Sequence, residues 1–371
     1  MSTSDLQQLA SEKGKICISI LLPTDRHTRE RQQNPIIVLK AIQKAKALLD
    51  SVGAEEEIEL LRSKLDAIEK QIDYLRLQEG LGIFVSQNIS NVFLFPISVK
   101  EKIIVETKFA LHDLYYLQQF IQPYYLLAIS KKRVPLYRCE GRHLQEIRND
   151  DFPKYYKDDY EYAYPSLGSS MGPGLKNVEG DKSIVAEGRQ ITFIKQVDRT
   201  LQKYLQTPMP LIVAGVDEEL ANFSHATHHS KNIIGLIKGN YAVDALHLLS
   251  DLAWEKVNAH IIASHDAMIK KLDEDIGKKM AVDGIQDVWA MAKLGKGLTL
   301  IVERDYHSVG YVDRSNEVKL YRNPPPMKHQ IITDAVEEII STVIEKKGEI
   351  VVVQNGEMQE HGGIGLIQRY P

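Results

Sequence analysis

The sequence has few of the residues that hold metal ions or cross-link chains. Its 371 residues include only two cysteines, Cys17 and Cys139, and each lies in an apolar, strand-like run. They show neither the paired spacing of a structural zinc site nor the framework of a disulfide-stapled secreted domain. We therefore expect two buried thiols.

Long hydrophobic runs and an excess of charge of one sign are also missing. No apolar stretch approaches the length that crosses a bilayer, and the polar N-terminus lacks a signal-peptide pattern. The formal net charge is −4, which excludes attraction of nucleic acid by the protein as a whole, so any such contact must be local. These absences predict a cytoplasmic protein with no membrane and no DNA among its partners.

The apolar content that is present, 43% hydrophobic residues, suffices for two or three domains. Residues 1–120 predict an α+β domain. Its expected elements are a strand at 15–23, helices that begin near 34 and 55, and strands at 82–86 and 92–96. The apolar residues of the two helices recur every three or four positions, which predicts an antiparallel helical hairpin.

Residues 121–255 predict a central α/β domain with a mixed sheet flanked by helices. The segment begins with strands. Its last predicted elements are a helix from about 190 to 205 and a strand at 210–215. Between them, residues 149–187 are polar and rich in Tyr, Gly, Ser and Lys, without periodicity, which predicts a long loop. Loops of this length are usually functional or disordered.

Residues 256–371 alternate between helix and strand patterns, which is typical of a small α/β sandwich. The boundary with the central domain falls inside a helical apolar pattern at 242–278. Two β-branched runs at 350–353 and 364–367 predict the strands that close the last sheet. The fold class expected for the whole chain is therefore α/β and α+β in three domains.

A basic stretch follows the first strand. Its candidate RNA-binding residues are Arg26, His27, Arg29, Arg31, Lys40 and Lys44. Clustered cations displace counterions from a phosphate backbone, so this stretch could bind RNA. A charged loop and a solvated helix face explain the same residues equally well.

Three histidines, His225, His228 and His229, are weak candidates for a metal site, because imidazoles three or four residues apart can face one way on a helix. No nearby carboxylate or cysteine pattern completes such a site. Polar neighbours favour a surface loop instead, and we expect neither a metal nor a cofactor.

Several short motifs occur in a fixed order along the chain. They are residues 19–24 (Ser-Ile-Leu-Leu-Pro-Thr), 79–85 (Glu-Gly-Leu-Gly-Ile-Phe-Val), 125–130 (Tyr-Leu-Leu-Ala-Ile-Ser), 210–216 (Pro-Leu-Ile-Val-Ala-Gly-Val), 284–304 and the Gly-Gly-Ile ending at 362–371. Their order resembles that of the class 1 release factors of archaea and eukaryotes and of Pelota, and most of all that of the bacterial archaeo-eukaryotic release factor families. The resemblance implies an RNase H-like central domain and a C-terminal sandwich of the kink-turn-binding ribosomal protein type.

The resemblance weakens at the catalytic motif. Class 1 release factors carry Gly-Gly-Gln at the end of the central loop, where glycines allow close approach to the peptidyl-tRNA ester and donors stabilise an oxyanion. This chain has Gly188-Arg189-Gln190 at the matching place, so Gly188 and Gln190 are only weak catalytic candidates. Helix N-terminal capping or solvent exposure is the alternative explanation for Gln190. The codon-reading motif Asn-Ile-Lys-Ser is also missing.

By resemblance, the protein is expected to act on ribosomes or tRNA in termination or ribosome rescue, in Pelota's non-hydrolytic manner. If it were an enzyme, it would hydrolyse the peptidyl-tRNA ester. A translational GTPase is a possible partner of the C-terminal domain. The alternatives are an interaction scaffold that keeps the fold and a metal-dependent hydrolase that uses the histidines.

Overall fold

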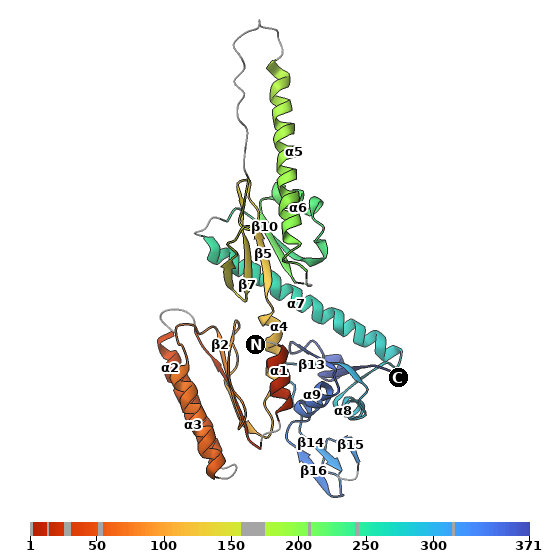
Figure 1. Ribbon diagram of the computed structural model, residues 1–371. Helices are drawn as coiled ribbons and strands as arrows, with labels where there is room; N and C mark the ends of the chain where they lie inside the picture. The colour runs from red at the N-terminus through yellow and green to blue at the C-terminus, as the bar shows by residue number, and fades with distance from the viewer. Residues whose placement is uncertain are drawn as a thin grey trace. The chain divides into compact units, whose positions relative to one another are not determined.

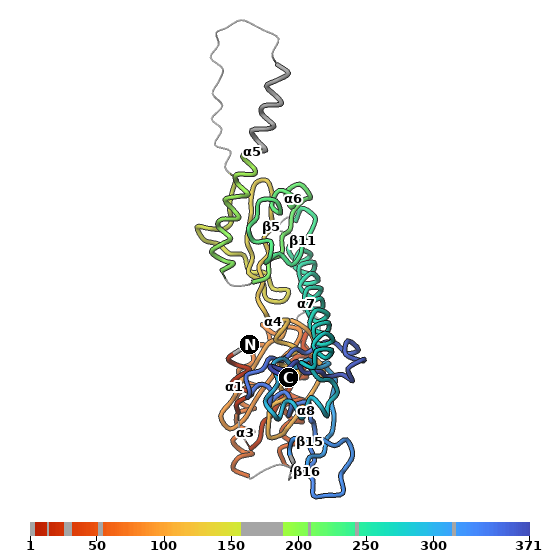
Figure 2. Tube along the Cα trace, turned by 90° about the vertical axis from the view of Figure 1, so that its right-hand side faces the viewer, coloured from red at the N-terminus to blue at the C-terminus, as the bar shows by residue number. Residues whose placement is uncertain are grey.

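The computed structural model describes residues 3–12, 15–25, 31–50, 55–156, 175–206, 209–241, 245–313 and 316–371. The chain forms two compact units (Figures 1 and 2). Unit 1 combines Met1–Ile121 with Ile261–Pro371, and unit 2 is Gln122–His260. The mixed α/β class is confirmed, whereas the division into three domains stays a prediction.

The N-terminal half of unit 1 is an antiparallel sheet with the order β3-β2-β1-β4. Its strands are β1 (Cys17–Pro23), β2 (Gly80–Val85), β3 (Ser90–Phe95) and β4 (Lys102–Glu106). Helices α2 (Asn34–Leu49) and α3 (Glu55–Gln71) lie along one side (Figure 1). Side chains alternate along β1, so Ile18, Ile20 and Leu22 share one core with the buried faces of both helices.

The C-terminal half of unit 1 contains two sheets. The larger has the order β12-β18-β13-β17 and the smaller the order β15-β14-β16. The strands are β12 (Ala281–Asp283), β13 (Gly297–Glu303), β14 (Gly310–Asp313), β15 (Asn316–Tyr321), β16 (His329–Ile332), β17 (Glu349–Val353) and β18 (Ile364–Gln368). Helices α8 (Ile285–Lys293) and α9 (Ala335–Glu345) pack beside them.

Two helices join these halves into one unit. Helices α1 (Thr3–Ser11) and α4 (Leu111–Ile121) both contact α9, and α4 also contacts β17. Gln119 Nε2 on α4 donates a hydrogen bond to the Val352 carbonyl at 2.7 Å. The first and last thirds of the sequence therefore share one packed interior.

Unit 2 is built on a five-stranded sheet with the order β11-β10-β5-β7-β8. Its strands are β5 (Tyr124–Ala128), β7 (Leu136–Glu140), β8 (His143–Glu146), β10 (Leu211–Gly215) and β11 (Ile233–Lys238), beside a short pair, β6 (Arg133–Val134) and β9 (Lys154–Tyr155). Strands β5, β7 and β8 form an antiparallel meander, whereas β10 and β11 run parallel to β5. Helices α5 (Leu175–Leu201) and α6 (Asp217–Ala226) pack on each other, and α7 (Leu246–Gly277) contains the unit boundary.

Helix α5 corrects the predicted course of the chain. The sequence predicted irregular structure up to residue 187 and a helix from about 190, but the helix begins at Leu175. Hydrophobic periodicity reports which residues are buried, and residues 175–189 carry little of it, so a helix there leaves no such signal. Residues 157–174 of the predicted loop lie outside the described residues.

Two other expectations concern the thiols and the membrane. Cys17 and Cys139 are both buried, as predicted. Among the described residues, no helix combines the length and apolar content needed to cross a membrane.

Candidate functional site

The tripeptide Gly188-Arg189-Gln190 lies in the interior of α5, not at its start. The capping explanation for Gln190 is therefore wrong. In a helix interior the backbone N–H groups close hydrogen bonds to carbonyls four residues earlier, so they are not open donors. The Gly188 carbonyl accepts a hydrogen bond from Thr192 Oγ1 at 2.9 Å. The exposed Gly188 could carry a Cβ without meeting any atom within 4 Å.

The C-terminal part of α5 is fixed to the sheet of unit 2. Phe193, Ile194, Val197 and Leu201 are buried in one core with residues of β5 and β10. Asp198 on the same stretch is only 3% exposed. A buried carboxylate requires hydrogen-bond partners, and the turn after α6 supplies them.

The Asp198 carboxylate holds the turn that follows α6. It accepts hydrogen bonds from Thr227 Oγ1 at 2.6 Å and from the His228 backbone N–H at 3.3 Å, and it lies 2.8 Å from His228 Nδ1. His229 Nε2 is 3.9 Å from the same carboxylate. No sequence pattern signalled this contact, because Asp198 precedes the histidines by about thirty residues.

The three histidines do not share a helix face. His225 is exposed on α6, whereas His228 and His229 follow the helix end at Ala226. The imidazole of His228 is 86% exposed, with its Nδ1 beside Asp198. In the described part of the chain, no group of three His, Cys, Asp or Glu side chains is arranged to hold a metal ion.

The basic stretch is described only in part. Arg26, His27 and Arg29 lie outside the described residues, and of Arg31 only the backbone is described, in the short 3-10 helix Arg31–Gln33. The buried Asn34 side chain bonds the backbone N–H of Asp25 at 3.0 Å and its carbonyl at 2.8 Å, which fixes the two ends of this segment together.

Two of the candidate cations project from the exposed side of α2. Lys40 is exposed, and Lys44 Nζ lies 2.6 Å from the equally accessible Glu101. An exposed ion pair contributes little to stability, so Lys44 can exchange Glu101 for another anion. The structure thus leaves both lysines accessible to a phosphate backbone.

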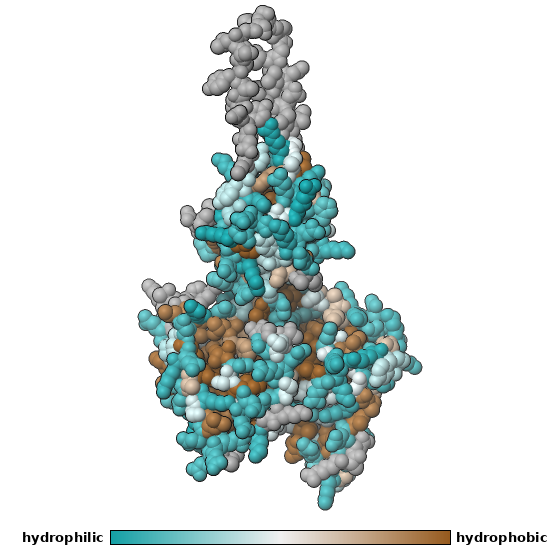
Figure 3. Space-filling view, viewed as in Figure 1, coloured by the Kyte–Doolittle hydropathy of each residue, from teal (hydrophilic) through white to brown (hydrophobic). Residues whose placement is uncertain are grey.

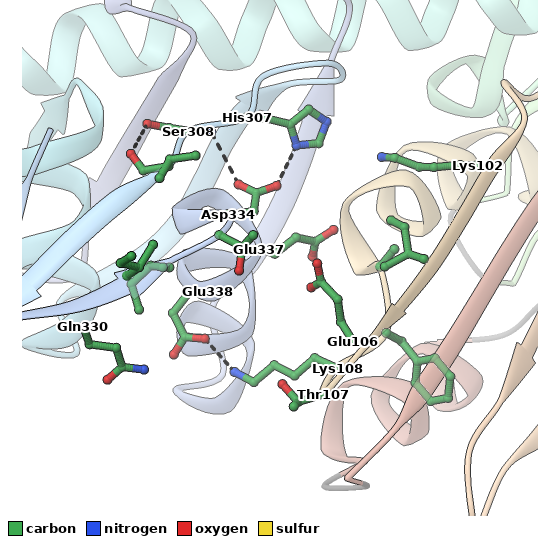
Figure 4. Close-up of a pocket in the computed structure, with 17 residues that line it drawn as sticks. Lys102, Glu106, Thr107, Lys108, His307, Ser308, Gln330, Asp334, Glu337 and Glu338 are labelled. Carbon is green, nitrogen blue, oxygen red and sulfur yellow. Dashed lines mark hydrogen bonds and ion pairs between the residues drawn. The ribbon is translucent and has the colours of Figure 1, made fainter. Parts of the chain in front are cut away.

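Sequence patterns offered no hint of a second site, the junction cavity, where the two halves of unit 1 meet (Figure 4). Its volume is about 530 Å³. It is lined by β4 and residues 107–110, by the loop at His307–Val309, by β16, and by the first turn of α9. The two sides are more than 200 residues apart in the chain, which explains why no local motif revealed it.

Charged groups gather at the junction cavity. His307 Nδ1 lies 2.6 Å from Asp334 Oδ2, and this contact raises the pKa of His307. Lys108 reaches Glu338 at 2.8 Å from the opposite half (Figure 4). Burial raises the pKa of Glu106, and the charge on Asp334 adds to the effect.

Glu337 is the most strongly perturbed of these groups. Its carboxyl accepts hydrogen bonds from the backbone N–H groups of Leu111 and His112, each at 3.2 Å. Burial nevertheless raises the pKa of Glu337 to about 8, and Asp334 contributes in the same direction. Burial also lowers the pKa of His112 to about 4, and both of its ring nitrogens lack hydrogen-bond partners within the described chain.

The middle part of the chain is similar to a known protein family. Residues 123–296 match the family described as bacterial archaeo-eukaryotic release factor family 3. No curated protein matches the chain in sequence.

Three solved structures are similar over most of their length. The archaeal translation termination factor aRF1 is 13% identical, over 100% of this chain and 99% of its own, with a TM-score of 0.25. Dom34 of S. cerevisiae, a termination-like factor interacting with Hbs1, is 12% identical over 76% of this chain and 73% of its own, with a TM-score of 0.41. An archaeal Pelota bound to the ribosome with ABCE1 is 12% identical over 100% of this chain and 94% of its own, with a TM-score of 0.37.

TM-scores this low establish neither contacts nor partners for this protein. The match over residues 123–296 spans the whole sheet of unit 2 together with α5 and α6. The resemblance predicted from the motifs is therefore confirmed, and over residues 123–296 the chain is similar to bacterial archaeo-eukaryotic release factor family 3.

Proposed function

We propose that this protein is a cytoplasmic factor that associates with ribosomes or tRNA in translation termination or ribosome rescue. The match of residues 123–296 to a release factor family is the observation that carries the proposal. Because that match contains Gly188-Arg189-Gln190, the same segment also bears on whether the factor is catalytic.

The proposed factor acts without hydrolysing peptidyl-tRNA. Gly-Gly-Gln does not occur in the sequence, and the related tripeptide is continuous with helix on both sides. A helical backbone N–H is already hydrogen-bonded and cannot also stabilise an oxyanion. The side chain of Arg189 adds bulk where close approach to the ester would be needed.

The finer fold assignments are part of the same proposal. An RNase H-like sheet in unit 2 is supported by its meander of three antiparallel strands followed by two parallel strands on the other side of β5. A three-domain division at 1–120, 121–255 and 256–371 fits the sequence, with a sandwich of the kink-turn-binding ribosomal protein type at the end.

The proposed partners follow from charge and family. The cations from Arg26 to Lys44 contact RNA phosphate, which the accessibility of Lys40 and Lys44 on α2 supports. A translational GTPase binds the C-terminal part of the chain. Among the similar proteins, Dom34 of S. cerevisiae interacts with a partner, Hbs1.

Cosedimentation with purified 70S ribosomes at increasing salt tests the association. Replacing Arg26, Arg29 and Arg31 by alanine should weaken binding and reduce the slope of log Kd against log salt by roughly 2, if each contact contributes about 0.7. The matched control replaces the exposed Lys270, Lys271 and Lys328 by alanine, which should change neither quantity. Equal losses in both variants, or no binding by the unmodified protein, would contradict the proposal.

A single-turnover release assay on ribosomes carrying peptidyl-tRNA tests the non-hydrolytic part. We expect the unmodified protein to bind without raising peptide release above the rate in buffer. Release that Gln190→Ala abolishes, with ribosome binding unchanged, would show instead that the tripeptide is catalytic.

A further inference from the structure

Strand β16 is an edge strand that borders the junction cavity. Within the described residues it pairs with β14 alone, since β14 lies between β15 and β16 in the small sheet. Three consecutive residues of the strand, Gln330 to Ile332, line the cavity, and so does Thr333 just after it. Successive side chains of a strand point to opposite faces, so three in a row line one cavity where the backbone edge of the strand borders it. Unpaired N–H and C=O groups on such an edge can pair with an extended peptide.

Across the cavity, β4 presents side chains instead of its backbone. Lys102, Ile104 and Glu106 line the cavity, whereas Ile103 and Val105 between them pack on the core under α2 and α3. Every second residue therefore faces the space opposite β16. One wall thus offers backbone groups and the other offers side chains. The backbone groups can bind an extended peptide, and the side chains can select its sequence.

Among the described residues, two carboxyls of the cavity lack a cation partner, and the pKa of each is raised. Lys102 pairs with Asp113 at 2.7 Å, and Lys108 pairs with Glu338. No cation among the residues that the structure describes pairs with Glu106 or Glu337, although both point into the space between β4 and α9 (Figure 4). A positively charged group entering the cavity would favour the ionised form of both carboxyls, whose pKa values are raised in its absence, and would pair with them.

The rim of the cavity is apolar. Ile331 is 62% exposed and Val309 is 52% exposed, and both line the cavity. Figure 3 shows hydrophobic surface beside the β14–β16 sheet on the face in view. Exposed aliphatic side chains next to carboxyls without a cation partner suit a ligand in which apolar and basic side chains alternate.

We propose that the junction cavity binds an extended peptide segment of a partner protein, which pairs with the free edge of β16 and places a Lys or Arg side chain between Glu106 and Glu337. The neighbouring apolar side chain of the peptide rests on Val309 and Ile331. This binding site is independent of the basic stretch and of the tripeptide in α5, so it stands whether or not the protein associates with ribosomes.

Fluorescence anisotropy with a synthetic probe tests the proposal on the full-length protein. The probe is a labelled, acetylated hexapeptide in which Val and Arg alternate. A second peptide carries Glu in place of Arg, and a third is the Val-Arg peptide with N-methyl groups on alternate backbone amides. We expect the Val-Arg peptide to bind at least tenfold more tightly than either of the other two, because only it offers both the charge and the strand edge.

Two variants locate the binding. The double variant Glu106→Gln with Glu337→Gln keeps side-chain size and should weaken binding at least tenfold, while the control Glu349→Gln, an exposed carboxyl at the start of β17, should leave it unchanged. Amide hydrogen exchange at residues 329–333 should slow when the probe is bound. The proposal is overturned if the Glu peptide or the N-methylated peptide binds as well as the Val-Arg peptide, if no peptide binds, or if Glu349→Gln weakens binding as much as the double variant.

Discussion

Each unit of the protein places a carboxylate near histidine, but buried Asp198 and half-buried Glu337 have different surroundings. In unit 2, Asp198 accepts hydrogen bonds from Thr227 and from His228, and these bonds fasten the turn after α6 to α5. In unit 1, the partners of Glu337 among the described residues are two backbone N–H groups, and its carboxyl faces a cavity.

These different surroundings indicate a structural role for Asp198 and a binding role for Glu337. A buried carboxylate that accepts hydrogen bonds from a hydroxyl and a backbone N–H and also lies beside an imidazole contributes stability and has little capacity left for a ligand. A carboxyl that lacks a cation and borders open space keeps that capacity, at some expense of stability. We therefore assign Asp198 to the packing of unit 2, and Glu337 to recognition.

The largest effect is expected for Asp198→Ala. The substitution removes Asp198, which is only 3% exposed, and with it the acceptor of Thr227 Oγ1 and of the His228 N–H. Removing one member of such a network destabilises a protein by roughly 2–4 kcal/mol. Thermal unfolding and faster amide exchange at residues 227–229 would measure the loss.

Two further variants show whether the effect comes from these hydrogen bonds. Asp198→Asn keeps one carbonyl acceptor and should lose about half as much stability. Asp217→Ala removes an exposed carboxylate of α6 and should change stability by less than about 0.5 kcal/mol. A loss for Asp198→Ala no larger than that for Asp217→Ala would remove the distinction between the carboxylates of Asp198 and Glu337.

A smaller, pH-dependent effect is expected for Glu337→Gln. With its pKa raised from 4.5 to about 8, the folded protein holds a proton on Glu337 that the unfolded chain has released. The stability tied to that proton is complete below about pH 4.5 and is lost as the pH rises through 8. The variant has no such titration, so relative to the unmodified protein it should gain roughly 1–3 kcal/mol between pH 5 and 8.5, after allowance for solvent in the cavity.

Comparing the variant with the unmodified protein at the same pH removes the contribution of the other titrating groups near Glu337. Glu106, His112 and His307 change protonation in both proteins, so they cancel in the difference. Glu345→Gln, at the opposite end of α9, is the matched control for the loss of a carboxyl from this helix. Urea unfolding at four pH values measures both, and a constant difference for Glu337→Gln would mean that its carboxyl is not buried.

Much of the local structure could be predicted because it depends on neighbours in sequence. The helix expected to begin at Asn34 begins there, and the strand expected at 210–215 is β10, Leu211–Gly215. The apolar residues of the helix recur with the helical period because one face is buried, whereas the strand is a continuous apolar run because both of its faces are buried. The family resemblance rested in part on the strand at 210–216.

The rest depends on contacts between distant residues. Helix α4 has buried residues on most of its circumference, because it packs against α9 and β17 as well as within its own half. No amphipathic pattern marks such a helix. Glu337 meets the N–H of Leu111 across 226 positions, so neither residue predicts the junction cavity by itself.

The smallest effect on stability is expected for Gly188→Ala. The direction of this effect shows whether the tripeptide acts as part of a helix or as a mobile catalytic segment. Because Gly188 lies in the interior of α5 and an added Cβ would meet nothing within 4 Å, alanine should stabilise the helix by about 0.5–1 kcal/mol. Gly277, at the end of α7, also has open space, and alanine there should give a smaller gain because the last turn is less constrained. Circular dichroism during thermal unfolding measures both gains. If α5 were unwound when the protein acts, Gly188→Ala would instead reduce ribosome binding or peptide release. Such a loss would indicate that the tripeptide takes part in the function of unit 2.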